Sequence, residues 1–282
     1  MCASGLEFSV KAVTSFVLLL LAVGVATGIT TVLFGFGGGF VSVPAVYAAV
    51  NATGGADAMH TAVATSAVVM IVNAAVATVA SARRGLLNRA YLWPITSFIA
   101  LGAVLGALAA NWASERILHL LFVAYVAATM MDSIARDGFL RRFPAQNLAS
   151  PLSVTESTFG GIGIGAVASF LGVGGSVLTV PLLRRKGVAM ADATALANPL
   201  SLPVAIAGSV VFALAASGPI HSGQIGYINP AAAALLLGGS LPAIALTKRT
   251  IAKKAIPDQT HAIVYLVLLG IVLIAMIATI AR

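Results

Sequence analysis

Long apolar runs that are almost free of charge restrict how this chain can fold more than any other feature. They cover residues 14–34, 61–82, 91–110, 193–216 and 263–281, with shorter runs between them. Of the 282 residues 60% are hydrophobic and only 9% are charged, too few to cover a water-soluble globule of this size. Since a spanning helix needs ~20 apolar residues, we expect an all-α polytopic membrane protein with about eight spanning helices.

A polar segment in the middle of the chain separates two halves with the same order of apolar runs. Each half has one long run, one short run and then three longer runs. The short runs, residues 40–50 and 177–183, are too short to cross a bilayer comfortably and indicate re-entrant or broken helices. The predicted organisation is a first transmembrane repeat at residues 1–135, a cytoplasmic linker at 136–153 and a second transmembrane repeat at 154–282.

The same glycine-rich turn precedes both short runs and is the most specific signal in the sequence. Residues 35–44 align without a gap on residues 172–181, with five identical positions and Ser176 in place of Gly39. Glycine permits positive φ and close approach of a ligand to the backbone. A helix that starts directly after such a turn presents unpaired N–H groups and a positive dipole end. The duplicated turn therefore predicts an anion site.

The charges of the loops indicate that the two halves have opposite orientation. Residues 83–89 contain three arginines. The matching loop, residues 217–227, contains one histidine and no lysine or arginine. The reverse holds for the next loop, because residues 248–254 contain four basic residues and residues 112–116 are nearly neutral. Residues 184–186 and the linker, with Arg136, Arg141 and Arg142, contribute three basic residues each, and placing all four basic segments in the cytoplasm accounts for 13 of the 16 lysines and arginines. The positive-inside rule then predicts inverted repeats whose two turns meet near the midplane.

The predicted substrate site combines the two turns with nearby hydroxyl and amide side chains. The expected substrate contacts are Gly37, Gly38, Gly39, Phe40, Ser42, Thr65, Ser66, Asn73, Gly174, Gly175, Ser176, Thr179, Asn198 and Ser201. The expected structural or hinge positions are Gly35, Pro44, Gly172, Pro181, Pro199 and Pro203. The alternative explanation is close helix packing by glycine and helix-to-helix hydrogen bonding by the hydroxyls.

Several other classes of function are disfavoured by what the sequence lacks. No Asp, Glu, Lys or Arg lies in the middle of a long run, which argues against a carboxylate proton relay. The spacing of Cys, His and Glu residues predicts no metal, haem or other cofactor. No hydrolase or nucleotide-binding motif is present, so no enzymatic activity is expected. The net charge of +8 is explained by topology signals rather than by nucleic-acid binding.

The sequence resembles the sulfite exporter TauE/SafE family over nearly its whole length. The resemblance rests on the two glycine–proline segments, on Ala64-Thr65-Ser66 and on the spacing of Gly102 and Gly106. It implies a multi-pass protein of a prokaryotic inner membrane that exports small sulfur-containing anions such as sulfite, sulfoacetate or other organosulfonates. Ser176 and Asn198, which stands where the first half has Ser66, make the two sides of the site chemically unequal.

Three functions remain open from the sequence. The first is a secondary carrier in which two inverted halves give alternating access to a small anion. The second is a passive anion channel on the same repeat, and the third is a membrane scaffold without transport. The particular anion, the transport direction, the coupling ion and the oligomeric state do not follow from these residues.

Overall fold

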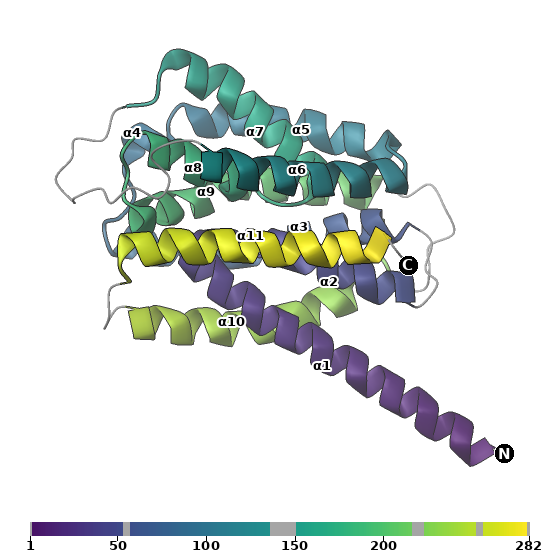
Figure 1. Cartoon of the computed structure of the whole chain (residues 1–282). Helices are drawn as coiled ribbons and strands as arrows, with labels where there is room; N and C mark the ends of the chain where they lie inside the picture. The colour runs from purple at the N-terminus through teal and green to yellow at the C-terminus, as the bar shows by residue number, and fades with distance from the viewer. Residues whose placement is uncertain (1, 53–56, 136–150, 216–222, 252–255, 281–282) are drawn as a thin grey trace.

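A computed structural model describes residues 2–52, 57–135, 151–215, 223–251 and 256–280, and this part of the chain is helical without a strand (Figure 1). The helices are α1 (Cys2–Phe34), α2 (Gly39–Ala52), α3 (Ala58–Arg83), α4 (Arg89–Leu92), α5 (Ile95–Trp112), α6 (Glu115–Ala135), the π-helical turn η1 (Glu156–Gly160), α7 (Gly161–Leu171), α8 (Ser176–Arg185), α9 (Met190–Leu214), α10 (Pro230–Ile251) and α11 (Asp258–Ile280). The expected all-α class is confirmed. Most of the predicted linker, residues 136–150, lies outside the described residues.

Seven helices in the described ranges are long and apolar enough to cross a membrane, which confirms a polytopic membrane protein. The eighth expected span, residues 159–171, forms the end of η1 and then α7. The two short runs form α2, with 14 residues, and α8, with 10 residues. Both begin directly after a glycine turn, as the sequence predicts.

Helices α3 and α9 form the centre of the bundle. In each of them 61% of the spanning window is buried, whereas the other candidate spans are 28–39% buried. They pack against each other, while α5 packs on α7 and α1 packs on α10. Figure 1 shows α5 and α7 at the top of the view and α1 and α10 at the bottom. The central pair is therefore shielded from lipid on both sides.

Glycine allows α5 and α7 to touch through their backbones. A Cβ atom at Gly102 would lie 2.0 Å from the carbonyl oxygen of Ile162, and one at Gly106 would lie 2.0 Å from that of Ala166. From the other side, a Cβ at Gly165 would lie 2.1 Å from a carbonyl of α5. Because apolar burial supplies little drive for helix association in lipid, this close packing is what holds the pair together.

Helices α1 and α10 also come into backbone contact at glycine residues. A Cβ at Gly24 would lie 2.4 Å from the carbonyl oxygen of Leu236, and one at Gly28 would lie 2.3 Å from that of Ser240. The two glycines are four residues apart, as are Gly102 and Gly106. Both outer helix pairs therefore depend on the absence of a side chain.

Gly106→Ala is expected to destabilise the bundle, because the new methyl group meets backbone that cannot rotate away. Overpacking of this kind costs about 1–3 kcal/mol. The matched control is Gly163→Ala in α7, where nothing lies within 4 Å of the added atom. Thermal unfolding in detergent should show a lower Tm for the first variant only. Equal Tm values would contradict backbone contact between α5 and α7.

Candidate functional site

The two glycine turns lie side by side in the interior of the bundle. A Cβ atom at Gly39 would lie 2.6 Å from the carbonyl oxygen of Gly172. In the opposite direction, a Cβ at Gly174 would lie 3.4 Å from the carbonyl oxygen of Phe36. All residues of both turns are buried. Segments 137 positions apart in the chain thus form one continuous buried surface of backbone.

The backbone of both turns uses conformations that favour glycine. The φ angles are 72° at Gly35, 61° at Gly37 and 103° at Gly38, and 68° and 74° at Gly172 and Gly174. Two glycines do not follow this pattern: Gly39 begins α2, and Gly175, the cap of α8, has a φ of −68°. The cap residue Gly175 has no side chain to accept a hydrogen bond from the start of α8. The N–H of Leu178 donates to the carbonyl of Gly175 at 3.2 Å, so the free helix start consists of the N–H groups of Ser176 and Val177.

Five of the predicted substrate contacts carry buried polar atoms that have no hydrogen-bond partner within the described part of the chain. They are Ser66 Oγ, Asn73 Nδ2, Ser176 Oγ, Thr179 Oγ1 and Asn198 Oδ1. Each of these residues is at most 3% exposed. A buried polar atom without a partner costs about 1–3 kcal/mol, so each of these atoms can gain from binding a polar ligand or water.

Two of these side chains lie against the first turn. The Nδ2 atom of Asn73 would be 2.9 Å from a Cβ at Gly38, and its Oδ1 accepts a hydrogen bond from Ser240 at 2.8 Å. The Nδ2 atom of Asn198 donates to the carbonyl of Thr194 at 3.3 Å, and the carbonyl of Thr194 also faces Gly35. One amide from α3 and one from α9 therefore flank this turn.

Other predicted contacts already have partners inside the protein. The hydroxyl of Ser42 donates to the carbonyl of Gly38 at 2.8 Å. The hydroxyl of Ser201 donates within α9 at 2.9 Å and would lie 3.5 Å from a Cβ at Gly174. The hydroxyl of Thr65 accepts the N–H of Asn229 at 3.0 Å. Ser42 and Ser201 thus belong to the surroundings of the turns, whereas Thr65 joins α3 to the segment just before α10.

Phe40 belongs to an aromatic cluster beside the first turn. Its ring centroid lies 5.0 Å from that of Phe36 and 6.2 Å from that of Phe122. The ring of Tyr265 in α11 lies 5.3 Å from Phe36, and its hydroxyl donates to the carbonyl of Val177 at 3.1 Å. Tyr265 thus connects the two turns. The sequence analysis missed it, although a tyrosine within an otherwise aliphatic run was a usable signal.

Met70 is a second residue that the sequence analysis missed. Its sulfur would lie 2.6 Å from a Cβ at Gly174, and its Cγ would lie 2.6 Å from one at Gly37. The thioether of this α3 side chain therefore fills the space between the turns. No local signal distinguished it from the other apolar residues of α3, because its role depends on how the two halves meet.

The predicted hinge prolines all lie inside helices. Pro44 is in α2, Pro181 is in α8, and Pro199 and Pro203 are in α9. Each removes one helical N–H and leaves the carbonyl four residues earlier without its usual partner. The weakened positions flank the turns, and their role as hinges stays a prediction.

A cavity of about 450 Å³ leads from the surface towards the first turn. Its mouth carries three basic side chains, Arg83, Arg84 and Lys248, and one carboxylate, Asp192. Asn198 also lines it. The cavity therefore joins a positively charged entrance to one of the amides beside the glycine turn, and positive clefts concentrate anions.

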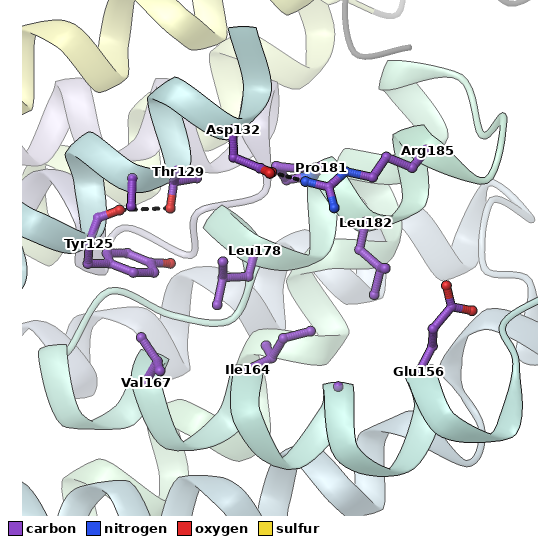
Figure 2. Close-up of a pocket in the computed structure, with 12 residues that line it drawn as sticks. Tyr125, Thr129, Asp132, Glu156, Ile164, Val167, Leu178, Pro181, Leu182 and Arg185 are labelled. Atoms are coloured by element: carbon purple, nitrogen blue, oxygen red, sulfur yellow. Dashed lines mark hydrogen bonds and ion pairs between the residues drawn. The ribbon is translucent and has the colours of Figure 1, made fainter. Parts of the chain in front are cut away.

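A second cavity, of about 410 Å³, lies between α6, η1, α7 and α8 (Figure 2). Its lining includes Tyr125, Leu178 and Pro181, and an ion pair between Asp132 and Arg185 lies at one edge. The glycines of the two turns are not among its lining residues. We therefore treat it as separate from the predicted substrate site.

Two carboxylates hold the first turns of the central helices, one at each end of the bundle. Glu115, the first residue of α6, accepts the N–H of Met59 in α3 at 2.8 Å. Asp258, the first residue of α11, accepts the N–H of Met190 in α9 at 2.7 Å. Sequence spacing did not predict either contact, because the partners are more than 50 residues apart.

Neutral polar groups surround the buried backbone of the turns, and comparison with known proteins agrees with a transport role. The TauE/SafE sulfite exporter family matches residues 20–276. A protein of Haemophilus influenzae described as a probable membrane transporter protein is 27% identical over 229 residues, which are 76% of this chain and 81% of that protein. No solved structure gives a significant match. The chain therefore belongs to the TauE/SafE sulfite exporter family, a family of multi-pass membrane transporters.

Proposed function

We propose that the protein is a secondary carrier that exports small sulfur-containing anions, such as sulfite, sulfoacetate or other organosulfonates, by alternating access around the paired glycine turns. The observation that carries this proposal is the contact between the turns, beside which the amide Nδ2 of Asn73 and the hydroxyl of Ser176 are buried without a partner in the described part of the chain. Membership of the family supports an anionic substrate.

Neutral donors suit an anion that must bind and then leave. The helix start at Gly175, the amide of Asn73 and the hydroxyls of Ser176 and Thr179 offer partial positive charge without a fixed cation. A buried lysine or arginine would bind an anion more tightly and slow its release. This arrangement favours transport over permanent binding.

The distribution of charge supports export. The cavity that reaches Asn198 is lined by Arg83, Arg84 and Lys248, which belong to loops that the positive-inside rule assigns to the cytoplasm. At the opposite end of α3, the first helical turn of α3 lies beside two carboxylates, Asp57 and Glu115. A positive mouth on the cytoplasmic side collects anions there, and the negative end disfavours their return.

The helix contacts support an inverted repeat. In that arrangement α1 corresponds to α7 and α10 corresponds to α5, and the observed outer pairs are α1 with α10 and α7 with α5. The bonds from Met59 to Glu115 and from Met190 to Asp258 are a second matching pair. Two halves that exchange equivalent contacts can rock about the central helices, as alternating access requires.

A passive anion channel on the same repeat and a membrane scaffold without transport are the competing functions. A channel gives flux that does not saturate at low substrate concentration, whereas a carrier saturates and exchanges substrate. A scaffold gives no stabilisation by any anion. Thermal shift in detergent with sulfite, sulfoacetate, taurine, sulfate and thiosulfate, followed by uptake into proteoliposomes, separates the three.

Ser176→Ala and Thr179→Val are expected to weaken anion binding without weakening the fold. Neither hydroxyl has a partner in the described protein, so its removal leaves no other group unpaired. Loss of one hydrogen bond to an anion should weaken binding about 10- to 100-fold. Ser133→Ala removes an equally buried, unpartnered hydroxyl from α6 and serves as the control. Unchanged affinity in both site variants would contradict the proposed site.

Arg83→Gln combined with Arg84→Gln should lower the rate of anion loading from the cytoplasmic side. The loss should be largest at low ionic strength, because salt screens the attraction between the entrance and the anion. Arg89→Gln removes an exposed basic residue that does not line the cavity and is the control. Initial uptake into inside-out vesicles at two salt concentrations measures the effect. Equal losses in the double variant and the control would show that the cavity is not the entrance.

Cysteines at Ser114 and Thr250, introduced separately into a Cys2→Ser background, should be labelled from opposite sides of the membrane. Both positions are exposed, and they follow corresponding apolar runs, residues 91–110 in the first half and residues 231–246 in the second. Inverted halves put corresponding loops on opposite sides. Labelling of intact cells and of inside-out vesicles with an impermeant maleimide makes the comparison. Labelling of both cysteines from one side would refute the inversion.

A further inference from the structure

Three potential metal ligands converge at the end of α3 that faces away from the basic cavity. The three residues are Asp57, His60 and Glu115, and one ligand atom from each lies within 4.8 Å of the other two. Asp57 and His60 belong to the start of α3 and Glu115 to the start of α6. His60 is only 5% exposed, while Asp57 is exposed. The cluster thus has a buried inner ligand and an open outer one.

The surroundings of His60 fix which ring nitrogen faces the cluster. Its Nε2 lies 3.2 Å from the carbonyl oxygen of Ala110, which can only accept, so Nε2 carries the hydrogen. The ring also stacks on Tyr227 at a centroid distance of 5.0 Å. Nδ1 is buried without a hydrogen-bond partner and lies 3.9 Å from Glu115 Oε1. In neutral His60, the unprotonated Nδ1 therefore lies near a carboxylate.

The carboxylate of Asp57 does not cap α3, the helix that follows it. It occupies the N-cap position of α3, yet its side chain makes no capping hydrogen bond. Glu115 performs that task instead, by accepting the N–H of Met59. A proton on His60 could bridge only two atoms. A metal ion gathers several ligands at once and would give the second carboxylate, Asp57, a role beside the pair.

The other end of the bundle shows how a comparable carboxylate is balanced. Asp258, which holds α9 as Glu115 holds α3, pairs with the buried guanidinium of Arg184 at 2.9 Å. Among the described residues, Glu115 pairs with His60 and with no lysine or arginine. A bound cation at His60 would supply the positive charge that Arg184 supplies at the opposite end.

We propose that Asp57, His60 and Glu115 bind a divalent transition-metal ion that joins the first turns of α3 and α6. One imidazole with two carboxylates suits zinc or a neighbouring first-row metal better than magnesium or calcium, which prefer oxygen ligands alone. In a tetrahedral site, ligand atoms ~2 Å from one zinc ion are ~3.3 Å apart. His60 Nδ1 and Glu115 Oε1, now 3.9 Å apart, must approach by about 0.6 Å. The longest separation, within 4.8 Å, must close by about 1.5 Å.

The supporting contacts have the form usual around metal ligands. A ligating histidine commonly donates its other N–H to a backbone carbonyl, as His60 does to Ala110. A ligating carboxylate is commonly held by a further hydrogen bond, as Glu115 is by Met59. None of the residues of this metal site belongs to the glycine turns, so zinc binding can be tested apart from anion binding. Asp57 and Glu115 are also the carboxylates of the negative end, and a bound divalent ion would cancel their charge.

Zinc binding to the full chain tests the proposal. The protein, purified in detergent, freed of any histidine tag and stripped with chelator, is titrated with zinc chloride. Metal content per chain and Tm are measured. We expect one zinc ion per chain and a raised Tm. Asp57→Asn and His60→Gln should weaken zinc binding by more than about tenfold. Asp192→Asn, which alters an exposed carboxylate at the other end of the bundle, should not.

Asp57→Asn decides the outcome if the His60 variant fails to fold, since the exposed Asp57 side chain makes no capping bond. Wild-type protein whose Tm does not respond to zinc would overturn the proposal. So would zinc stabilisation that survives both substitutions. Stabilisation by acid that depends on His60, without any effect of zinc, would show that the pair binds a proton and no metal.

Discussion

A break in a helix inside a membrane is tolerated only where other protein or a wet cavity covers the backbone. This constraint governs the whole bundle. The chain breaks after Phe34 and again after Leu171, and each break is covered by the other. Helices α3 and α9 enclose the pair, and Met70 and Tyr265 fill the space around it. Glycine is required because any side chain at Gly39 would separate the two turns.

The outer helices use the same principle for a different purpose. At Gly102, Gly106 and Gly165, and at Gly24 and Gly28, glycine serves close packing and does not mark a ligand. Close helix packing therefore explains these outer glycines, while the anion site at the turns stays a proposal. What distinguishes the turns is their positive φ and the unpartnered polar atoms beside them. The packing glycines lie in continuous helix.

Charge is kept to the ends of the bundle and differs between them. One end has the basic cavity and the Arg184–Asp258 pair, and the other has Asp57, His60 and Glu115. Between them, the described residues place neutral polar side chains near the turns, among them the donor Asn73 Nδ2 and the hydroxyl of Ser176. An anion crossing this bundle would pass from a positive entrance to dipoles and then to a negative end. The proposed metal would reduce that negative charge and link it to the packing of α3 and α6.

The sequence by itself determined the membrane class, the two short helices and the positions of both turns, because hydropathy and glycine spacing are local properties. It also located the buried polar residues of α3, α8 and α9. Only the tertiary structure decided which hydroxyls are satisfied, as Ser42 is and Ser176 is not. It alone revealed Met70, Tyr265 and the Asp57–His60–Glu115 cluster. Those roles arise from atoms that approach in space although they are distant in the chain, and spacing along one segment carries no record of such contacts.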